Sequence, residues 1–217
     1  MAGLNLIYKG AEAELYRGKW LGFDVVFKRR VAKAYRNPDL DRYIRVTRTS
    51  LEAKLLSDAR RLGVPTPIVY MVDSVRTEIA MSYIDGQPLK KLVPAMDHDA
   101  VIQAFIAVGE AVGMLHAGGM VHGDLTTSNI IVKDGAIFLI DMGLGEYTPS
   151  VEARGVDLHL MRRALESSHF DSSVSAYAGF TKGYSDVMGA EARLVLNRVG
   201  DIRRRGRYVD GGRCMLE

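Results

Sequence analysis

A hairpin signal in the second half of the chain restricts the possible fold more than any other feature. Two apolar runs, 130–132 and 137–140, flank Asp134-Gly135, a dipeptide typical of a tight turn between antiparallel strands. Asn129 precedes the first run and Asp141 follows the second. Because the strands of a hairpin run in opposite directions, the sequence predicts that Asn129 and Asp141 lie almost opposite each other at its open end.

The residues at this open end suit the transfer of a phosphoryl group. The amide oxygen of Asn129 and the carboxylate of Asp141 are hard oxygen ligands of the kind that Mg²⁺ prefers. Asp124 lies five residues before Asn129 and is the candidate catalytic base. In the alternative interpretation the hairpin is an ordinary exposed one whose acids and amide only cap turns. The combined spacing, Asp-x4-Asn and then Asp-x-Gly, favours the catalytic interpretation.

A lysine and a glutamate in the first part of the chain extend this set. In the predicted strand 24–28, the period of two places Val26 and Lys28 on one face, where they can line a nucleotide. A predicted helix begins with Thr49 as its N-cap, and Glu52 borders its apolar face. We predict that Glu52 pairs with Lys28 and holds the ammonium group against the phosphates. The alternative is that Glu52 only completes a capping box with Thr49.

Composition and turn residues indicate one α+β domain with two lobes. The chain has 217 residues, of which 47% are hydrophobic, and a single cysteine, Cys214, so it can bury a core but cannot form an intrachain disulfide. Short predicted strands and one helix fill residues 1–84, and Asp85-Gly-Gln-Pro88 marks a break. We expect a small β-rich N-lobe over 1–84, a mostly helical C-lobe over 85–206, and a basic tail over 207–217.

Apolar periodicity predicts three helices in the second lobe. The first covers 97–116 and supports the loop that carries Asp124. The second opens at Asp157, sixteen residues after Asp141, and the last covers 190–205. No Ala-Pro-Glu or similar peptide-docking sequence lies between Asp141 and Asp157, so little chain is left there for a protein-substrate platform.

The segment before the break between the lobes is a candidate adenine site. Backbone groups from Ser82 to Ile84 can hydrogen-bond an adenine edge, and Met81 limits the depth of the pocket. Met81 is equally compatible with a plain core position. No charged-then-apolar leader opens the chain, so we expect a soluble, cytoplasmic protein without a membrane segment.

Basic residues gather in two places although the net charge is only +3. The first group faces only Asp39 and Asp41 as acids and consists of Lys28, Arg29, Arg30, Lys33, Arg36, Arg42, Arg45 and Arg48. The second is Arg203-Arg204-Arg205-Gly206-Arg207 near the end of the chain. RNA phosphates, an acidic partner surface or plain solvated helix surface are all compatible with such clusters.

The order of Lys28, Glu52, Asp124, Asn129 and Asp141 resembles that of a minimal atypical protein kinase. The chain is further similar, over nearly its whole length, to the small kinase/ATPase subunit of the KEOPS tRNA-modification complex, a relative of the RIO-type kinases. The segments that carry this resemblance are Lys9-Gly-Ala-Glu-Ala13, 28–41 with Tyr35-Arg-Asn-Pro-Asp-Leu-Asp41, Arg48-Thr-Ser-Leu-Glu-Ala53, Gly63-Val-Pro-Thr-Pro67 and Val156-Asp-Leu158.

The resemblance implies a two-lobed protein-kinase-like fold and an enzyme that uses ATP and Mg²⁺. It implies that the chain docks on the threonylcarbamoyl-transferase subunit and works with the other KEOPS subunits. ATP hydrolysis would then support the threonylcarbamoyl-adenosine modification of tRNA, which is reached through the complex. Serine/threonine protein kinase activity and autophosphorylation are also implied.

Carried over to this chain, the resemblance gives each matching residue a role. Lys28 contacts the phosphates, Glu52 positions Lys28, Asp124 is the catalytic base, and Asn129 with Asp141 holds magnesium. The nucleotide is covered by Gly10, Ala11, Glu12 and Ala13 and is bordered by Met81, Ser82 and Ile84. Asp157 braces the catalytic loop from below, or is merely an acid favoured by a helix N-terminus.

Two departures from ordinary kinases change these expectations. The covering loop, Gly10-Ala-Glu-Ala-Glu14, lacks the Gly-x-Gly-x-x-Gly pattern, so its backbone offers a thinner cradle for phosphates. Gly123 stands where ordinary kinases have the arginine that reads a phosphorylated activation loop. We therefore expect activity that does not depend on such phosphorylation.

Three other functions compete with this interpretation. A small-molecule phosphotransferase shares the His-Gly-Asp-Leu motif but usually adds a large helical insertion, for which this chain has no spare segment. A RIO-type protein kinase of ribosome assembly shares the compact lobes but usually has an N-terminal module. A non-catalytic scaffold is disfavoured because all five residues with catalytic roles are present.

Overall fold

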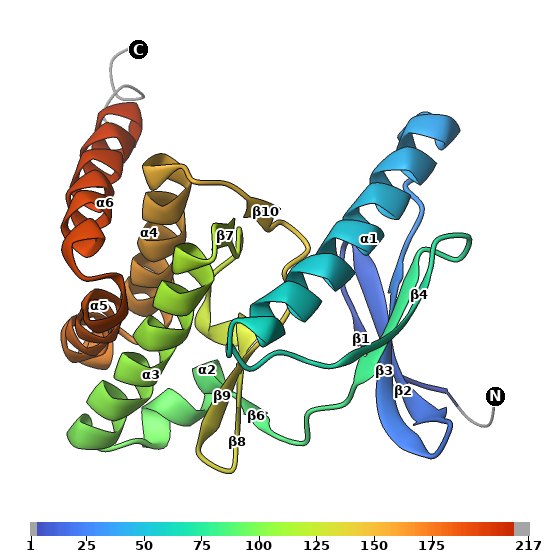
Figure 1. Cartoon of the computed structure of the whole chain (residues 1–217), viewed down its shortest axis with the longest axis horizontal. Helices are drawn as coiled ribbons and strands as arrows, with labels where there is room; N and C mark the ends of the chain where they lie inside the picture. Colours follow the sequence, from blue (N-terminus) through green and yellow to red (C-terminus); the bar gives the residue numbers. More distant parts are fainter. Residues whose placement is uncertain (1–3, 211–217) are drawn as a thin grey trace, which may run out of the picture.

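The computed structural model describes residues 4–210, which form an N-terminal β-sheet followed by a mostly helical part. The sheet is antiparallel, in the order β1-β2-β3-β5-β4. Its strands are β1 (Asn5–Lys9), β2 (Ala13–Trp20), β3 (Phe23–Arg30), β4 (Val69–Asp73) and β5 (Glu78–Ser82). Helix α1 (Pro38–Arg61) runs diagonally between this sheet and the helices (Figure 1). The predicted fold class is therefore confirmed.

The face assignment on β3 is confirmed. Val25 and Phe27 are buried in a small cluster with Ala80 on one face of the sheet. Val26 and Lys28 lie on the opposite face, toward the helical part, as the strand period predicts. The hairpin turn between β2 and β3 is formed by Leu21 and Gly22, both with positive φ.

Helix α1 begins twelve residues earlier than predicted, counting from Thr49 to Asn37. Its N-cap is Asn37, whose side-chain oxygen accepts from Asp39 N at 3.0 Å and Leu40 N at 3.2 Å, and Pro38 occupies the first helical position. Thr49 is an interior residue whose hydroxyl donates to Arg45 O at 2.7 Å. The predicted N-cap at Thr49 is wrong because a threonine can bond back along a helix as well as cap one.

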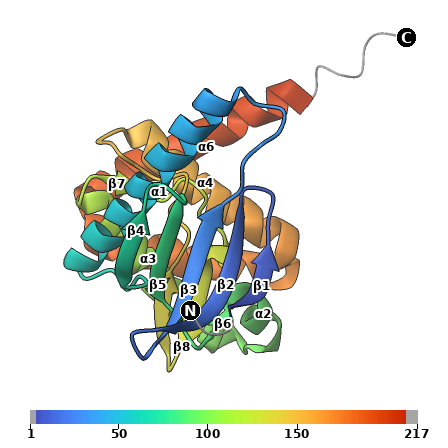
Figure 2. The same cartoon turned by 90° about the vertical axis from the view of Figure 1, so that its right-hand side faces the viewer.

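The helical part follows a short connection after β5 (Figure 1). Most of its helices lie behind the sheet in the view of Figure 2. Its longer helices are α3 (His98–Ala117), α4 (Val151–Ser168), α5 (Ser173–Met188) and α6 (Ala190–Asp210). The shorter elements are β6 (Gln87–Pro88), α2 (Leu89–Leu92), η1 (Val93–Ala95), β7 (Met120–Val121), η2 (Thr127–Asn129), β8 (Ile130–Lys133), β9 (Ala136–Leu139), β10 (Glu146–Tyr147) and η3 (Phe170–Ser172).

The predicted hairpin is present as β8 and β9. Ile130 pairs with Leu139 and Lys133 with Ala136, and the turn residues Asp134 and Gly135 have φ values of 51° and 78°. Two positive φ angles in a two-residue loop match the twist of the strands, which is why Asp-Gly is favoured there. β6 adds a third strand to this small sheet.

Helix α5 has no counterpart among the predicted helices. It packs against α3 at glycines on both sides: a Cβ on Gly109 would collide with Phe180 O, and a Cβ on Gly183 would collide with Ile106 O. Glycine lowers helix propensity but lets two backbones approach closely. The glycines that make α5 difficult to predict from the sequence are therefore the residues that allow it to pack against α3.

Two boundaries in the C-terminal half also differ from the prediction. Helix α4 starts at Val151 with Ser150 as N-cap, so Asp157 lies inside the helix and does not open it. Helix α6 continues to Asp210, so residues 207–210 of the expected tail are helical. Residues 211–217, including Cys214, lie outside the described part of the chain.

Candidate active site

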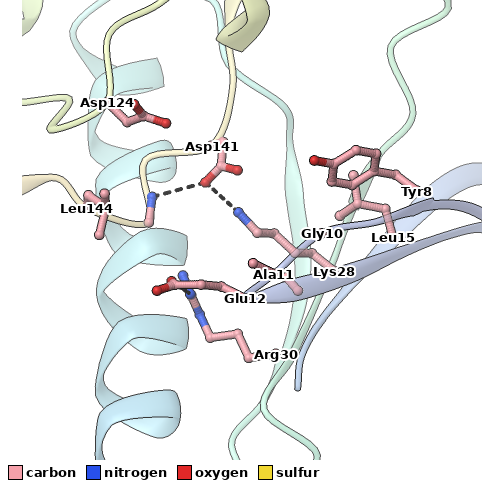
Figure 3. A pocket seen from close by; sticks show the side chains of 12 residues that line it. Tyr8, Gly10, Ala11, Glu12, Leu15, Lys28, Arg30, Asp124, Asp141 and Leu144 are labelled. Atoms are coloured by element: carbon pink, nitrogen blue, oxygen red, sulfur yellow. Dashed lines mark hydrogen bonds and ion pairs between the residues drawn. The ribbon is translucent and has the colours of Figure 1, made fainter. Parts of the chain in front are cut away.

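Three charged side chains from separate elements meet at the centre of the molecule. The Lys28 ammonium group lies 2.6 Å from Glu52 Oε1. It also lies 2.5 Å from Asp141 Oδ1 (Figure 3). Lys28 comes from β3, Glu52 from the middle of α1 and Asp141 from the end of the β8–β9 hairpin. The predicted contact of Glu52 with Lys28 is confirmed, and the capping-box alternative is excluded because Glu52 is not in the first turn of α1.

These contacts fix the charges of the lysine and of Asp141. Burial acts to lower the pKa of Lys28, but the carboxylates of Glu52 and Asp141 outweigh it and raise the pKa above its ordinary value. Partial burial acts to raise the pKa of Asp141, but the Lys28 ammonium group holds it below its usual range. At neutral pH both groups are therefore ionised. Asp141 also has a φ of 59°, a strained backbone conformation of the kind found at functional sites.

Asn129 holds the proposed base in place. Its side-chain Nδ2 donates to the carbonyl oxygen of Asp124 and to Asp124 Oδ2, both at 2.9 Å. Asn129 also lies opposite Ile140, the residue before Asp141, because the Ile140 N–H donates to Asn129 O at 3.0 Å. Asn129 and Asp141 are therefore almost opposite each other, as predicted. Because the amide nitrogen is used by Asp124, the amide oxygen is the group left for a cation.

His122 links the loop of Asp124 to the hairpin. Its Nε2 donates to Ile140 O at 3.0 Å, and its Nδ1 accepts from Asp124 N at 3.3 Å. The neighbouring Gly123 has a φ of 80°, and a Cβ there would collide with Leu144 O. Glycine is therefore the residue that this backbone conformation and this close approach allow.

Asp157 braces the catalytic loop from below, as predicted. It is 1% exposed and accepts from His122 N at 2.6 Å and from Gly123 N at 2.8 Å. His116 Nε2 lies 3.3 Å from the same carboxylate, and Tyr184 OH lies 3.0 Å from His116 Nδ1. Burial lowers the pKa of His116, against the pull of Asp157, so His116 donates to Asp157 as a neutral ring and accepts from Tyr184.

The oxygen donors at the end of the hairpin are of the kind that suits magnesium. In the stretch from residue 4 to residue 210, no three His, Cys, Asp or Glu side chains gather as a metal site. The Asn129 amide oxygen and the Asp141 carboxylate are hard oxygen donors from two sides of one hairpin. Mg²⁺ usually takes only one or two protein ligands and completes its shell with phosphate oxygens and water, so this pair fits it.

Two adjoining cavities extend from this charged centre and share Leu15, Lys28 and Asp141. The polar one has a volume of about 260 Å³ and is lined by Gly10, Ala11, Glu12, Ala13, Arg30, Asp124, Gly143 and Leu144, with Tyr8 at its edge. The apolar one has a volume of about 150 Å³ and is lined by Val26, Pro67, Met81, Ser82, Tyr83, Ile84, Ile131 and Ile140, with Ile7 at its edge. A phosphate end beside an apolar end matches the two halves of a nucleotide.

The structure brings most of the predicted site residues to the lining of these two cavities. Asn129 and Glu52 line neither cavity, but Asn129 contacts Asp124 and Glu52 contacts Lys28. Within residues 4–210, the Ile84 N–H makes no hydrogen bond, whereas Tyr83 N donates to Asp24 O at 3.0 Å. The Ile84 donor is therefore available to an adenine edge, as expected for this segment.

The sequence pattern did not identify Arg30 as a site residue. Arg30 is 6% exposed, lines the polar cavity, and contacts Glu52 at 2.6 Å. The signal was present, because the strand period that places Val26 and Lys28 on one face places Arg30 there as well. It was hidden by the run of basic residues around it.

Comparison with known proteins identifies relatives over most of the chain. The model of the RIO domain family matches residues 14–146. The KEOPS complex subunit Bud32 of Pyrococcus abyssi is 40% identical over 212 residues, covering 94% of this chain and 96% of that protein. Probable bifunctional tRNA threonylcarbamoyladenosine biosynthesis proteins of Methanothermobacter thermautotrophicus and Methanosarcina mazei are 36% and 42% identical. These matches cover 95% and 94% of this chain but only 37% and 36% of the two longer proteins.

A solved structure shows the same fold. The Rio2 kinase-ADP/Mg²⁺-phosphoaspartate complex from Chaetomium thermophilum superimposes with a TM-score of 0.62, covering 94% of this chain and 71% of that one. The sequences are 15% identical, so this likeness concerns the fold alone.

Proposed function

The chain belongs to the family of RIO-domain kinases that includes the KEOPS subunit Bud32, and from this membership we propose that it is an ATP- and Mg²⁺-dependent subunit of a KEOPS-type complex. Its ATP hydrolysis would support the threonylcarbamoyl-adenosine modification of tRNA. The observation that carries the proposal is the Lys28, Glu52 and Asp141 cluster, placed between an apolar cavity and the loop that holds Asp124.

Each residue of the cluster has a role that its geometry supports. Lys28 turns from Asp141 to the phosphates, and Glu52 keeps the ammonium group at that position. Asn129 orients Asp124, which accepts a proton from the attacking oxygen. Asn129 and Asp141 would hold Mg²⁺, which supplies charge neutralisation on the phosphates when it is bound. Met81, Ser82 and Ile84 border the adenine, and residues 10–13 cover the nucleotide.

Water is the acceptor that the surroundings of the site favour. The segment between Asp141 and α4 is short, and Glu146–Tyr147 within it pairs with β7. This leaves little chain to position a peptide hydroxyl beside Asp124. Phosphorylation of serine and threonine, including autophosphorylation, is therefore placed second to hydrolysis.

The relatives support a partner that modifies tRNA. The bifunctional relatives carry the matching segment as part of a longer chain, of which the match covers 37% in one case. This supports a working contact with the threonylcarbamoyl-transferase subunit, and through it with the other KEOPS subunits and tRNA. The proposal places the protein in the cytoplasm. It includes no membrane: α3 is long and apolar enough to span one, but nine of its twenty residues are buried inside the protein.

Reconstitution tests this proposal directly. A threonylcarbamoyl-transferase subunit, tRNA, MgATP and an activated threonylcarbamoyl donor are incubated with and without the chain, and modified adenosine is measured in the recovered tRNA. Modification is expected to depend on the chain and to be lost with Asp141→Asn, while the complex still assembles. Equal modification without the chain would refute the role in tRNA modification.

The competing functions have less support. A ribosome-assembly kinase is suggested only by the Rio2 structure, which shows the fold and no more at 15% identity. A small-molecule phosphotransferase would need a substrate-binding insertion, whereas α3, α4, α5 and α6 pack on one another. The KEOPS assignment is instead supported by a relative that matches almost end to end.

The basic cluster on α6 is expected to serve tRNA. Helix α6 lies at the side of the molecule opposite the β-sheet (Figure 1). Arg204 and Arg205 are exposed and make ion pairs with Asp201 and Glu152; Arg207 also belongs to the cluster, but its side chain lies outside the described part. Reversing Arg203, Arg204, Arg205 and Arg207 to glutamate should weaken tRNA-dependent turnover and leave MgATP binding intact, since phosphate contacts are electrostatic.

Two double variants that change the net charge equally, at different places, test whether the position of the arginines matters. Arg204→Glu with Arg205→Glu is compared with Arg61→Glu and Arg76→Glu, two exposed arginines of the N-terminal part. Turnover is measured against tRNA concentration at several salt concentrations. Only the α6 pair should lose affinity for tRNA and show a shallower salt dependence. Unchanged turnover in the α6 variants would remove this role.

A further inference from the structure

Five charged side chains of alternating sign connect the catalytic cleft to the covering loop. Lys28 contacts Glu52 Oε1 at 2.6 Å, and Arg30 Nη2 contacts Glu52 Oε2 at 2.6 Å. Arg30 Nη1 lies 3.8 Å from Glu12 Oε2, to which Arg48 Nη1 donates at 2.8 Å. Lys28 and Arg30 belong to β3, Glu52 and Arg48 to α1, and Glu12 to the loop between β1 and β2. Figure 3 shows Glu12 and Arg30 side by side next to α1.

Arg30 is the middle member and is fixed from several sides. Its backbone N–H donates to Thr77 O at 3.0 Å, and the Thr77 hydroxyl donates to Arg30 O at 3.3 Å. Its guanidinium lies against the turn after Asp141, since a Cβ on Gly143 would be 2.6 Å from Arg30 Nη2. Its buried Nε finds no partner among residues 4–210. The side chain is therefore held mainly through the carboxylates of Glu52 and Glu12.

The Glu52 carboxylate needs a second cation because of what Lys28 has to do. The Glu52 side chain is fully buried, and a buried charge is unfavourable unless it is paired. When Lys28 turns from Asp141 to the phosphates, its positive charge is shared between the phosphates and Glu52, so Lys28 alone neutralises Glu52 less completely. The contact from Arg30 reaches the other oxygen of the carboxylate and does not depend on the nucleotide. Arg30 thus keeps Glu52 neutralised and oriented throughout.

We propose that Arg30 is a positioning residue for phosphoryl transfer, which holds Glu52 in place for Lys28 and links this pair through Glu12 to the loop over the nucleotide. The inference rests on the proposed ATP-dependent function. It places Arg30 in contact with Glu52 and Glu12, and not with the reacting atoms. The position of the covering loop and the alignment of Lys28 are then linked through the contacts of Arg30 with Glu12 and Glu52.

A double-mutant cycle on MgATP turnover tests the link to Glu52. Arg30→Met keeps the apolar stem and removes the charge. Turnover is measured for the wild-type protein, for Arg30→Met, for Glu52→Gln and for the double variant. Because Arg30 acts through Glu52, Arg30→Met should lower kcat by roughly tenfold in the wild-type protein and by less than about twofold in the Glu52→Gln background. Arg30→Lys should restore part of the loss.

The link to the covering loop has its own variant. Glu12→Gln should raise the KM for MgATP by several-fold and leave kcat within about twofold, since loop closure holds substrate and transition state alike. The matched control is Arg29→Met, the neighbour of Arg30 on β3, which is 39% exposed and pairs with Glu78 instead. It should have the turnover and KM of the wild-type protein. Thermal unfolding is recorded for every variant.

The outcomes separate this inference from the proposed function. Independent, multiplicative effects of Arg30→Met and Glu52→Gln would overturn the inference, as would an Arg30→Met protein that behaves like Arg29→Met. If Arg30→Met does not fold, Arg30→Lys and Glu12→Gln decide, and unchanged kcat and KM in both overturn it. A wild-type chain that binds MgATP without turning it over contradicts the proposed function instead, and the cycle is then measured on MgATP affinity.

Discussion

Replacing Asp141 by asparagine is expected to lower MgATP turnover by about 100-fold or more while the protein stays folded. A carboxylate that holds the metal against the phosphates contributes several kcal/mol to transition-state stabilisation, and each 1.36 kcal/mol is about tenfold in rate. The Asp141 side chain is 48% exposed, so its loss leaves no buried gap. Asparagine is chosen because it tolerates the φ of 59° better than alanine does. Phosphate release is measured against Mg²⁺ concentration.

The same hairpin offers a matched control. Asp134 also has a positive φ, 51°, and is exposed at the closed end of the hairpin, away from both cavities. Asp134→Asn therefore removes one carboxylate under the same backbone constraint and should turn over MgATP at the wild-type rate. Asp141→Asn with a normal rate and an unchanged Mg²⁺ requirement would show that Asp141 does not hold the metal.

Replacing Asp157 by alanine should destabilise the protein by about 3–5 kcal/mol in the free energy of unfolding. The substitution strips an acceptor from the backbone N–H groups of His122 and Gly123 and from the ring of His116, all of them at a site that is 1% exposed. Buried donors without acceptors carry the full cost of desolvation. Urea unfolding followed by circular dichroism measures the change. Turnover should fall as well, because the loop that carries Asp124 loses its support.

Two further variants on α4 bracket this result. Asp157→Asn keeps one oxygen acceptor and should lose clearly less stability than alanine. Glu166→Ala removes an exposed carboxylate that pairs with Arg162 on the same helix, and should change the free energy of unfolding by less than about 0.5 kcal/mol. If Asp157→Ala were as stable as Glu166→Ala, the bracing role of Asp157 would be wrong.

Local patterns predicted the site better than they predicted the ends of the helices. The Asp134-Gly135 turn determines which residues pair across the hairpin, so Asn129 and the residues beside Asp141 could be placed from spacing alone. The period of two on β3 likewise placed Lys28 on the face toward Glu52. Both inferences use short-range geometry that tertiary packing does not alter.

Packing between distant segments explains what the sequence did not reveal. The glycines of α5 look unfavourable for a helix until α3 lies against them. Thr49 has the residue type of a cap, yet the Asn37-Pro38 start lies upstream and the helix runs through it. Glu52 pairs with both Lys28 and Arg30 because of where α1 lies relative to the sheet. The spacing of residues within one element does not predict this position.

The central claim is that this chain passes the γ-phosphate of ATP to water in the service of a partner complex. The most direct measurement follows labelled γ-phosphate from MgATP with the wild-type protein and with Asp124→Ala, each alone and with the threonylcarbamoyl-transferase subunit and tRNA. The expected result is release of inorganic phosphate that the complex stimulates and that falls by about 100-fold or more in the variant. Label that appears mainly on protein hydroxyls, unaffected by the partner subunit or tRNA, would contradict the account and identify a protein kinase.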